Sequence, residues 1–284
     1  MEQQKPAFIR FLEKTLVFDR RYIFLLVALA AILPTIFPFK LPVYVTHETR
    51  GVYDEIEKIP DGSLIFFTFD YEPASIAECD PLAKAILRQC LRKKLKIVAT
   101  AFIVQGSGIG ERILKDMQKE FNLKYGEDYA WLGYRAGSQA MIIGLGENLK
   151  ETFRNDVYGN PTTDLPILKD VNSLKDFPYL VCVHDDSYIN YWIVYAYERL
   201  GTKIGSACTA IMASGMYPFL DAKQITGIVG GLKGASEYEK LINYPEFATK
   251  GMTVQSIIHS FIIVIIILGN IAFFILSFYS KKER

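Results

Sequence analysis

Two apolar stretches near the ends of the chain divide it into three parts. Residues 254–278 carry no charged side chain, and this length exceeds the ~20 helical residues needed to cross a bilayer. Residues 22–39 are also apolar, but Pro34 and Pro38 predict a kink or an early end. Because no small-residue cleavage site follows, we expect an uncleaved anchor rather than a signal peptide. The pattern predicts transmembrane helices at 22–40 and 251–279, followed by a tail at 280–284.

Between these stretches, short apolar runs alternate with amphipathic segments. The apolar runs are rich in β-branched and aromatic residues, and they predict strands at 64–69, 96–104, 129–133, 179–183 and 204–212. The helical patterns fall at 46–59, 81–95, 111–121, 138–148, 189–200 and 222–242.

Continuous apolar strands separated by helices indicate a parallel sheet that is covered on both faces. The predicted fold class is therefore α/β: a three-layer, mostly parallel sheet with Rossmann-like alternation. This domain spans residues 41–250 and is flanked by one transmembrane helix at each end.

The basic residues near the apolar stretches predict the orientation of the chain in the membrane. Residues 6–21 place apolar side chains at helical spacing among basic ones, which is typical of an amphipathic helix in the headgroup region. Five Lys and Arg residues precede the first stretch and three follow the second. The positive-inside rule then places both termini, including an amphipathic segment at 1–21, in the cytoplasm, and the domain outside it.

Cysteine usage and net charge exclude some classes of protein. The four cysteines lie in predicted helices and strands, which indicates buried thiols rather than a disulfide framework and slightly weakens the extracytoplasmic assignment. The formal net charge of +1 argues against nucleic acid as a partner.

Charged residues follow two of the predicted strands. Asp70 and Glu72 come after the first strand, and His184, Asp185 and Asp186 come after the fourth. In an open parallel sheet, ligands bind beyond the carboxyl ends of the strands, where the strand order reverses. If these two ends flank that crevice, the group could supply a general acid and base, and Asp70, His184 and Asp186 could hold a divalent metal.

A structural role is a strong alternative explanation for the same residues. Asp186 can cap the helix that follows it, and Asp70 and Glu72 can stabilise a helix N-terminus through their charge. His184 can be a buried, hydrogen-bonded imidazole.

The second predicted strand leads into a glycine-rich segment that contains Gly106, Gly108 and Gly110. Glycines before a helix could present N–H groups to a phosphate, and Arg135, after the third strand, could pair with an anionic ligand. However, the G-x-G-x-G spacing, its place after the second strand and the lack of a Walker lysine favour a flexible connection. No cofactor is strongly indicated.

Glycines also recur in the last predicted helix, at Gly227, Gly230, Gly231 and Gly234. Two i, i+4 pairs would place them on one helix face. Each glycine costs up to about 1 kcal/mol of helix propensity relative to alanine, so we expect a close backbone approach at this face. The approaching partner could be the sheet, another helix or a second copy of the chain.

The second transmembrane stretch contains two polar residues, His259 and Asn270, which lie on nearly one helix face. Polar groups in lipid tend to face protein, so these two residues and the glycine face together form the predicted interface.

These patterns favour a non-enzymatic structural or assembly subunit of an oligomeric membrane complex. Its expected partners are membrane lipid and either copies of itself or other membrane subunits. A membrane-tethered enzyme, such as a metal-dependent hydrolase with its site at the strand ends, is the first alternative, and a ligand-binding sensor subunit is the second. An enzyme should bring Asp70 and His184 within hydrogen-bond reach in a pocket, whereas a scaffold should cover that end with its own side chains.

Overall fold

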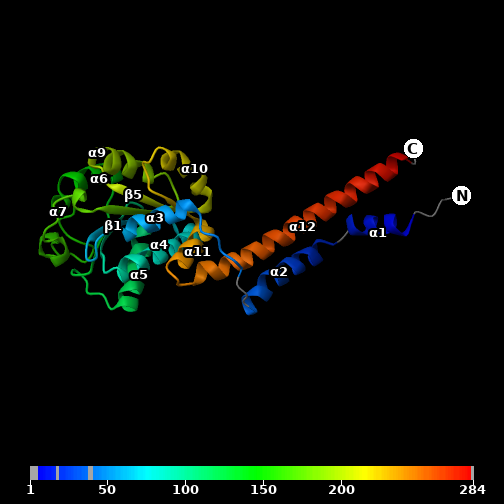
Figure 1. The fold of residues 1–284 in the computed structure, drawn as a ribbon, viewed down its shortest axis with the longest axis horizontal. Coiled ribbons are helices and arrows are strands. Elements are labelled where there is room, and N and C mark those ends of the chain that lie inside the picture. Colours follow the sequence, from blue (N-terminus) through cyan, green and yellow to red (C-terminus); the bar gives the residue numbers. More distant parts are fainter. Residues whose placement is uncertain (1–5, 17–18, 38–40, 283–284) are drawn as a thin grey trace. The chain divides into compact units, whose positions relative to one another are not determined.

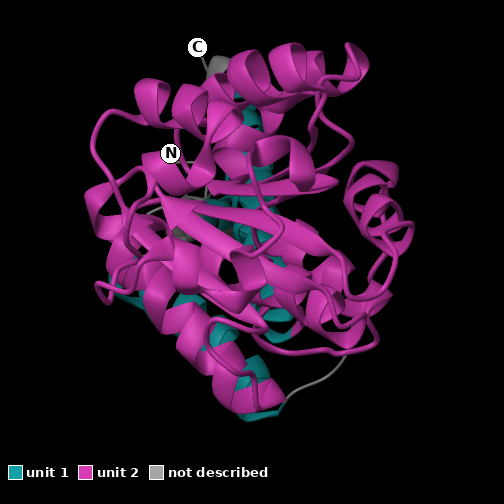
Figure 2. Ribbon diagram, turned by 90° about the vertical axis from the view of Figure 1, so that its left-hand side faces the viewer, with its two compact units in different colours: residues 1–41, 250–284 teal, residues 42–249 magenta. Residues whose placement is uncertain are grey.

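The computed structural model describes residues 6–16, 19–37 and 41–282, which form two units (Figures 1 and 2). One unit comprises residues 1–41 and 250–284, and the other comprises residues 42–249. Parts of the predicted amphipathic segment, of the first predicted transmembrane helix and of the tail, at residues 1–5, 17–18, 38–40 and 283–284, lie outside the described residues.

The first unit contains the helices α1 (Ala7–Leu16) and α2 (Arg20–Ile36) and most of α12 (Phe247–Lys282). In the described part of the chain, one helix is long and apolar enough to cross a membrane, the 33 residues Phe247–Tyr279 of α12. α2 has only 17 residues and contains Pro34. The structure therefore supports one candidate membrane-spanning helix, where the sequence predicts two.

The second unit is built on six parallel strands in the order β3-β2-β1-β4-β5-β6. Their bounds are β1 Leu64–Asp70, β2 Lys96–Ala101, β3 Tyr129–Tyr134, β4 Tyr179–His184, β5 Lys203–Cys208 and β6 Ile228–Gly230. This is the strand order of the Rossmann fold, and it reverses between β1 and β4. At that reversal Asp70 pairs in register with His184. The prediction of an α/β fold with a parallel sheet is confirmed.

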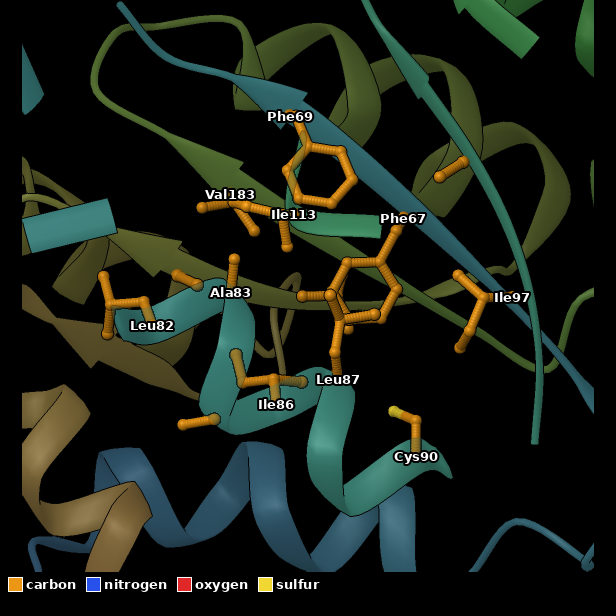
Figure 3. Close-up of a cluster of buried hydrophobic side chains, with 14 of the residues drawn as sticks. Phe67, Phe69, Leu82, Ala83, Ile86, Leu87, Cys90, Ile97, Ile113 and Val183 are labelled. Atoms are coloured by element: carbon orange, nitrogen blue, oxygen red, sulfur yellow. The ribbon is translucent and has the colours of Figure 1, made fainter. Parts of the chain in front are cut away.

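Helices cover both faces of the sheet because each strand is apolar on both faces. The alternation along β1 shows this, since Phe67 and Phe69 enter one core and Phe66 enters the other. The first core (Figure 3) packs against α3 (His47–Glu57), α4 (Ile76–Arg92), α5 (Val104–Phe121) and α11 (Gly231–Leu241). The second packs against α6 (Ser138–Glu147), α7 (Leu149–Thr152), α8 (Ile189–Trp192) and α10 (Ala210–Asp221).

The remaining elements are short. They are the 3-10 turns η1 Pro73–Ser75, η2 Thr162–Asp164, η3 Pro166–Leu168 and η4 Leu174–Asp176, the π-helical turn η5 Ile193–Tyr197, and α9 Glu198–Leu200. All four cysteines are free thiols and buried, as the sequence predicts.

Several predicted bounds are wrong. The strand predicted at 96–104 ends at Ala101, and the helix predicted at 111–121 begins already at Val104. The strand predicted at 204–212 ends at Cys208, which pairs with the last residue of β4, and the apolar run beyond it forms α10. The helix predicted at 222–242 begins only at Gly231, because residues 228–230 pair with β5 as a sixth strand. The single helical face of glycines is therefore absent from this segment.

The same glycines permit close packing within the domain. A Cβ built at Gly227 would overlap the Glu48 carbonyl oxygen and lie 2.6 Å from the Val52 nitrogen, and one at Gly51 would overlap the Thr226 carbonyl oxygen. Helix α3 therefore lies against the chain that enters β6, backbone to backbone. Gly231 has a φ of +58°, a left-handed conformation that favours glycine.

Alanine substitutions separate this packing role from helix propensity. Gly227→Ala should lower the free energy of unfolding by roughly 1–3 kcal/mol or more, because the added methyl group meets backbone atoms of α3. Gly215→Ala in α10 is the matched control, since nothing lies within 4 Å of its Cβ position. It should be neutral or stabilise by up to about 1 kcal/mol. Equal thermal unfolding midpoints for the two variants would contradict the packing explanation.

Candidate functional site

A cleft of about 460 Å³ opens at the carboxyl ends of the strands. Its walls come from the loops after β1 and β4, the start of α5 and the end of β3. The lining residues are Glu72, Phe102, Ile103, Val104, Gln105, Tyr134, Asp185, Asp186 and Tyr188. These segments lie at and beside the reversal between β1 and β4, which is where open α/β sheets bind ligands.

Asp70 ends β1 but is fully buried and absent from the cleft lining. Its carboxylate accepts hydrogen bonds from the Thr68 hydroxyl at 2.5 Å, the Phe102 N–H at 2.7 Å and the Trp192 indole N–H at 3.4 Å. Burial raises its pKa to about 6, although the three donors act in the opposite direction. Asp70 therefore joins β1, the end of β2 and α8.

His184 is also fully buried. Its Nδ1 lies 2.8 Å from the carbonyl oxygen of Asp186, which can only accept, so Nδ1 carries the proton. Nε2 lies 2.9 Å from the Ser206 hydroxyl, which donates to it. Burial lowers the pKa of His184 to about 4, so the ring is neutral at pH 7. Asp70 and His184 thus bond to other groups, and the hydrogen-bonded pair in a pocket that is expected of an enzyme does not form.

Three of the predicted carboxylates do gather in the cleft: Glu72, Asp185 and Asp186. Asp185 accepts the Glu72 backbone N–H at 2.9 Å, which ties the loop after β1 to the loop after β4 across the reversal. Asp186 accepts the Ser187 N–H at 2.5 Å, and its side chain remains exposed. Among the described residues, no three His, Cys, Asp or Glu side chains are arranged to hold a metal ion, so the predicted set of Asp70, His184 and Asp186 is dispersed.

The glycine-rich segment after β2 is helical, and the flexible connection predicted there is wrong. Gly106, Gly108 and Gly110 lie in the first two turns of α5. A Cβ at Gly106 would overlap the Phe69 carbonyl oxygen, and one at Gly110 would lie 2.8 Å from the Phe69 and Trp131 rings. These two glycines let α5 pack on β1, whereas the Gly108 position is open.

Arg135 lies outside the cleft lining. Its guanidinium donates to the Tyr134 and Asn155 carbonyl oxygens at 3.3 and 3.2 Å and lies 5.7 Å from the centre of the Phe153 ring. In this position it pairs with backbone and an aromatic ring rather than with the acidic residues.

The cleft carries negative charge. Its lining includes three carboxylates and, among the described residues, no Lys, Arg or His. The pKa of Tyr188 is raised, chiefly by burial and then by the charges of Asp70 and Asp186. Such a cleft favours ligands that bring positive charge or hydrogen-bond donors. The sequence alone drew attention to the start of α5 only for its glycines, and neither Tyr134 nor Tyr188 stood out as a candidate.

The chain matches no protein-family model, no curated protein and no solved structure. The geometry of the cleft therefore carries the functional argument.

The two buried groups at the reversal, His184 and Asp70, change the stability of the fold with pH in opposite directions. His184 has a folded pKa of about 4 against 6.5, so its favourable contribution is present above pH 6.5 and is lost as the pH falls toward 4. Asp70 has a folded pKa of about 6 against 3.8, so stability increases as the pH falls from 6 toward 4. Each effect is on the order of 3 kcal/mol, and the two largely offset each other.

Asp70→Asn should reveal how the protonation of His184 changes stability with pH, because the substitution removes the opposing titration of Asp70. We expect the thermal unfolding midpoint of this variant to fall more steeply between pH 6.5 and 4 than that of the wild type. His184→Gln should change the slope in the opposite direction. Melting curves recorded by circular dichroism in one detergent would measure both slopes, and parallel profiles for Asp70→Asn and the wild type would refute the assignment.

Proposed function

We propose that this chain is a membrane-anchored protein whose α/β domain binds a small organic ligand. The observation that carries the proposal is the open cleft at the reversal between β1 and β4. Its volume of about 460 Å³ is that of a small-molecule site. Because Asp70 and His184 are buried and bonded elsewhere, we propose binding rather than acid–base catalysis.

The lining indicates the chemistry of the ligand. Glu72, Asp185 and Asp186 can accept hydrogen bonds from an ammonium group or from hydroxyl groups. Tyr134 and Tyr188 add aromatic surface, and a tyrosine ring face also attracts a cation. An organic amine, with or without hydroxyl groups, fits these walls best.

We also propose an assembly role in the membrane, and the support for this second proposal lies in α12. His259 is exposed within the apolar part of this helix, and such polar groups favour a protein neighbour in lipid. Asn270 contributes less to this argument, because its side-chain amide donates to the Ile266 carbonyl oxygen of its own helix at 2.9 Å. A homo-oligomer or a complex with other membrane subunits would cover His259.

We also propose that α2, with residues that flank it, forms a second span, so that both termini are cytoplasmic and the domain is extracytoplasmic. The chain leaves the domain at both ends beside one helix, α11, where Glu237 binds Thr46 and Glu239 binds Thr249. This arrangement supports a domain held on one side of a bilayer by two anchors.

Ligand titrations can test the proposed function directly. Full-length protein in nanodiscs would be titrated with matched primary amines, polyols and carboxylic acids, with binding followed by calorimetry. We expect amines to bind better than acids, and Glu72→Gln or Asp186→Asn to weaken amine binding roughly tenfold or more, because a hydrogen bond to a charged group is worth about 1.5–3 kcal/mol.

The control is Asp170→Asn, which removes an exposed carboxylate outside the cleft. If it weakens binding as much as the cleft variants, or if acids bind better than amines, the proposed site is wrong.

A further inference from the structure

Two buried glutamates of α11 hold the ends of the domain. Glu237 and Glu239 are each 1 % exposed. Glu237 accepts the Thr46 N–H at 3.0 Å and the Thr46 hydroxyl at 2.6 Å. Glu239 accepts the backbone N–H groups of Glu246, Ala248 and Thr249 at 2.8, 3.0 and 2.8 Å, and the Thr249 hydroxyl at 2.5 Å. Both chain ends of the domain are therefore fixed to the same helix.

Tyr44 lies in the first of these fixed segments, and its side chain is 81 % exposed. On one side of it, the Lys240 ammonium donates to the Val43 carbonyl oxygen. On the other side, Thr46 is bonded to Glu237, which also pairs with Lys233 at 2.7 Å. The backbone on both sides of the tyrosine is thus attached to α11.

Lys233, Glu237 and Lys240 lie on one side of α11 because they are spaced i, i+4 and i+7. The side chain of Lys233 is 64 % exposed even though it pairs with Glu237. The carboxylate between the two lysines is that of Glu237, which is buried, whereas Lys233 is exposed.

Two more exposed aromatic residues lie where the other segment leaves α11: Tyr244 and Phe247, exposed to 36 % and 57 %. The Tyr244 ring lies 4.5 Å from the guanidinium of Arg88 and 5.2 Å from that of Arg92. The neighbouring acid, Glu246, pairs with Arg88. The acid beside this tyrosine is therefore already paired with a basic group.

We propose that Tyr44, Lys233, Lys240, Tyr244 and Phe247 together form one surface, the tether patch, which rests on the headgroups of an anionic bilayer. Aromatic side chains and lysines are the residues that anchor proteins at a membrane interface. The patch is continuous with α12, the candidate membrane-spanning helix, because Phe247 is its first residue. This inference depends on insertion of α12 and does not depend on the ligand proposed for the cleft.

Site-directed fluorescence in nanodiscs tests this contact. The four native cysteines are buried, and burial raises their thiol pKa, so an added exposed cysteine can be labelled selectively. An environment-sensitive dye would be placed on full-length Tyr44→Cys and, as a control, on Val104→Cys. Val104 is 61 % exposed and lines the cleft. Ser260→Cys in the apolar part of α12 reports insertion.

We expect the dye at 44 to shift to shorter emission wavelength and to be quenched by nitroxide-labelled lipid in nanodiscs that contain phosphatidylserine. The quenching at 44 should fall several-fold in purely zwitterionic nanodiscs or at high salt, because the lysine contacts are screened or lost. The dye at 104 should show neither effect, and the dye at 260 should be quenched in both lipids.

Three results would overturn the proposal. Equal behaviour of the dyes at 44 and 104 would place the patch in water. An emission shift at 44 without quenching by labelled lipid would mean that protein, such as a second copy of the chain, covers the patch. No quenching at 260 would remove the membrane anchor on which the inference depends.

Discussion

The reversal of strand order between β1 and β4 is the constraint on which the rest of the domain depends. The helices that follow β1 and β2 cover one face of the sheet, and those that follow β4 and β5 cover the other. The connections therefore diverge at the reversal and leave a cleft between them. The buried Asp70 carboxylate fixes this point, because its three donors belong to β1, the residue after β2 and α8. Asp185 links the loop after β4 to the loop after β1, because its carboxylate accepts the backbone N–H of Glu72.

Helix α4 relates the cleft to the attachment of the chain ends. It begins shortly after Glu72, and near its first turn Glu78 accepts the N–H of Ala210 at the start of α10 at 2.8 Å. At the other end of α4, Arg88 pairs with Glu246, and Arg92 donates to the Ile242 carbonyl oxygen. One helix thus runs from the proposed ligand site to the segment held by α11.

Local pattern was sufficient for the main part of β1 to β5, because each of these strands is an apolar run. It also indicated the end of the sheet at which the cleft lies, because β1 and β4 are followed by charged residues. It could not decide which carboxylates turn inward, since the donors to Asp70 include Trp192, which is 122 residues away. Local pattern also misassigned glycines. Gly106 lies in α5 because a side chain there would overlap the Phe69 carbonyl oxygen. Gly227 precedes β6, and a side chain there would overlap the backbone of α3. The three residues of β6 become a strand only by pairing with β5. These are tertiary effects that override local propensity.

The central claim is that the cleft at the reversal holds a small organic ligand. Native mass spectrometry of the full-length protein, released from nanodiscs after exposure to a small-molecule extract of the expressing cells, tests it most directly. Asp186→Arg, which brings a positive charge into the cleft, would be measured in parallel. The account predicts a discrete adduct of small-molecule mass on the wild type and its loss from the variant. No adduct on the wild type, or equal occupancy of the two proteins, would contradict it.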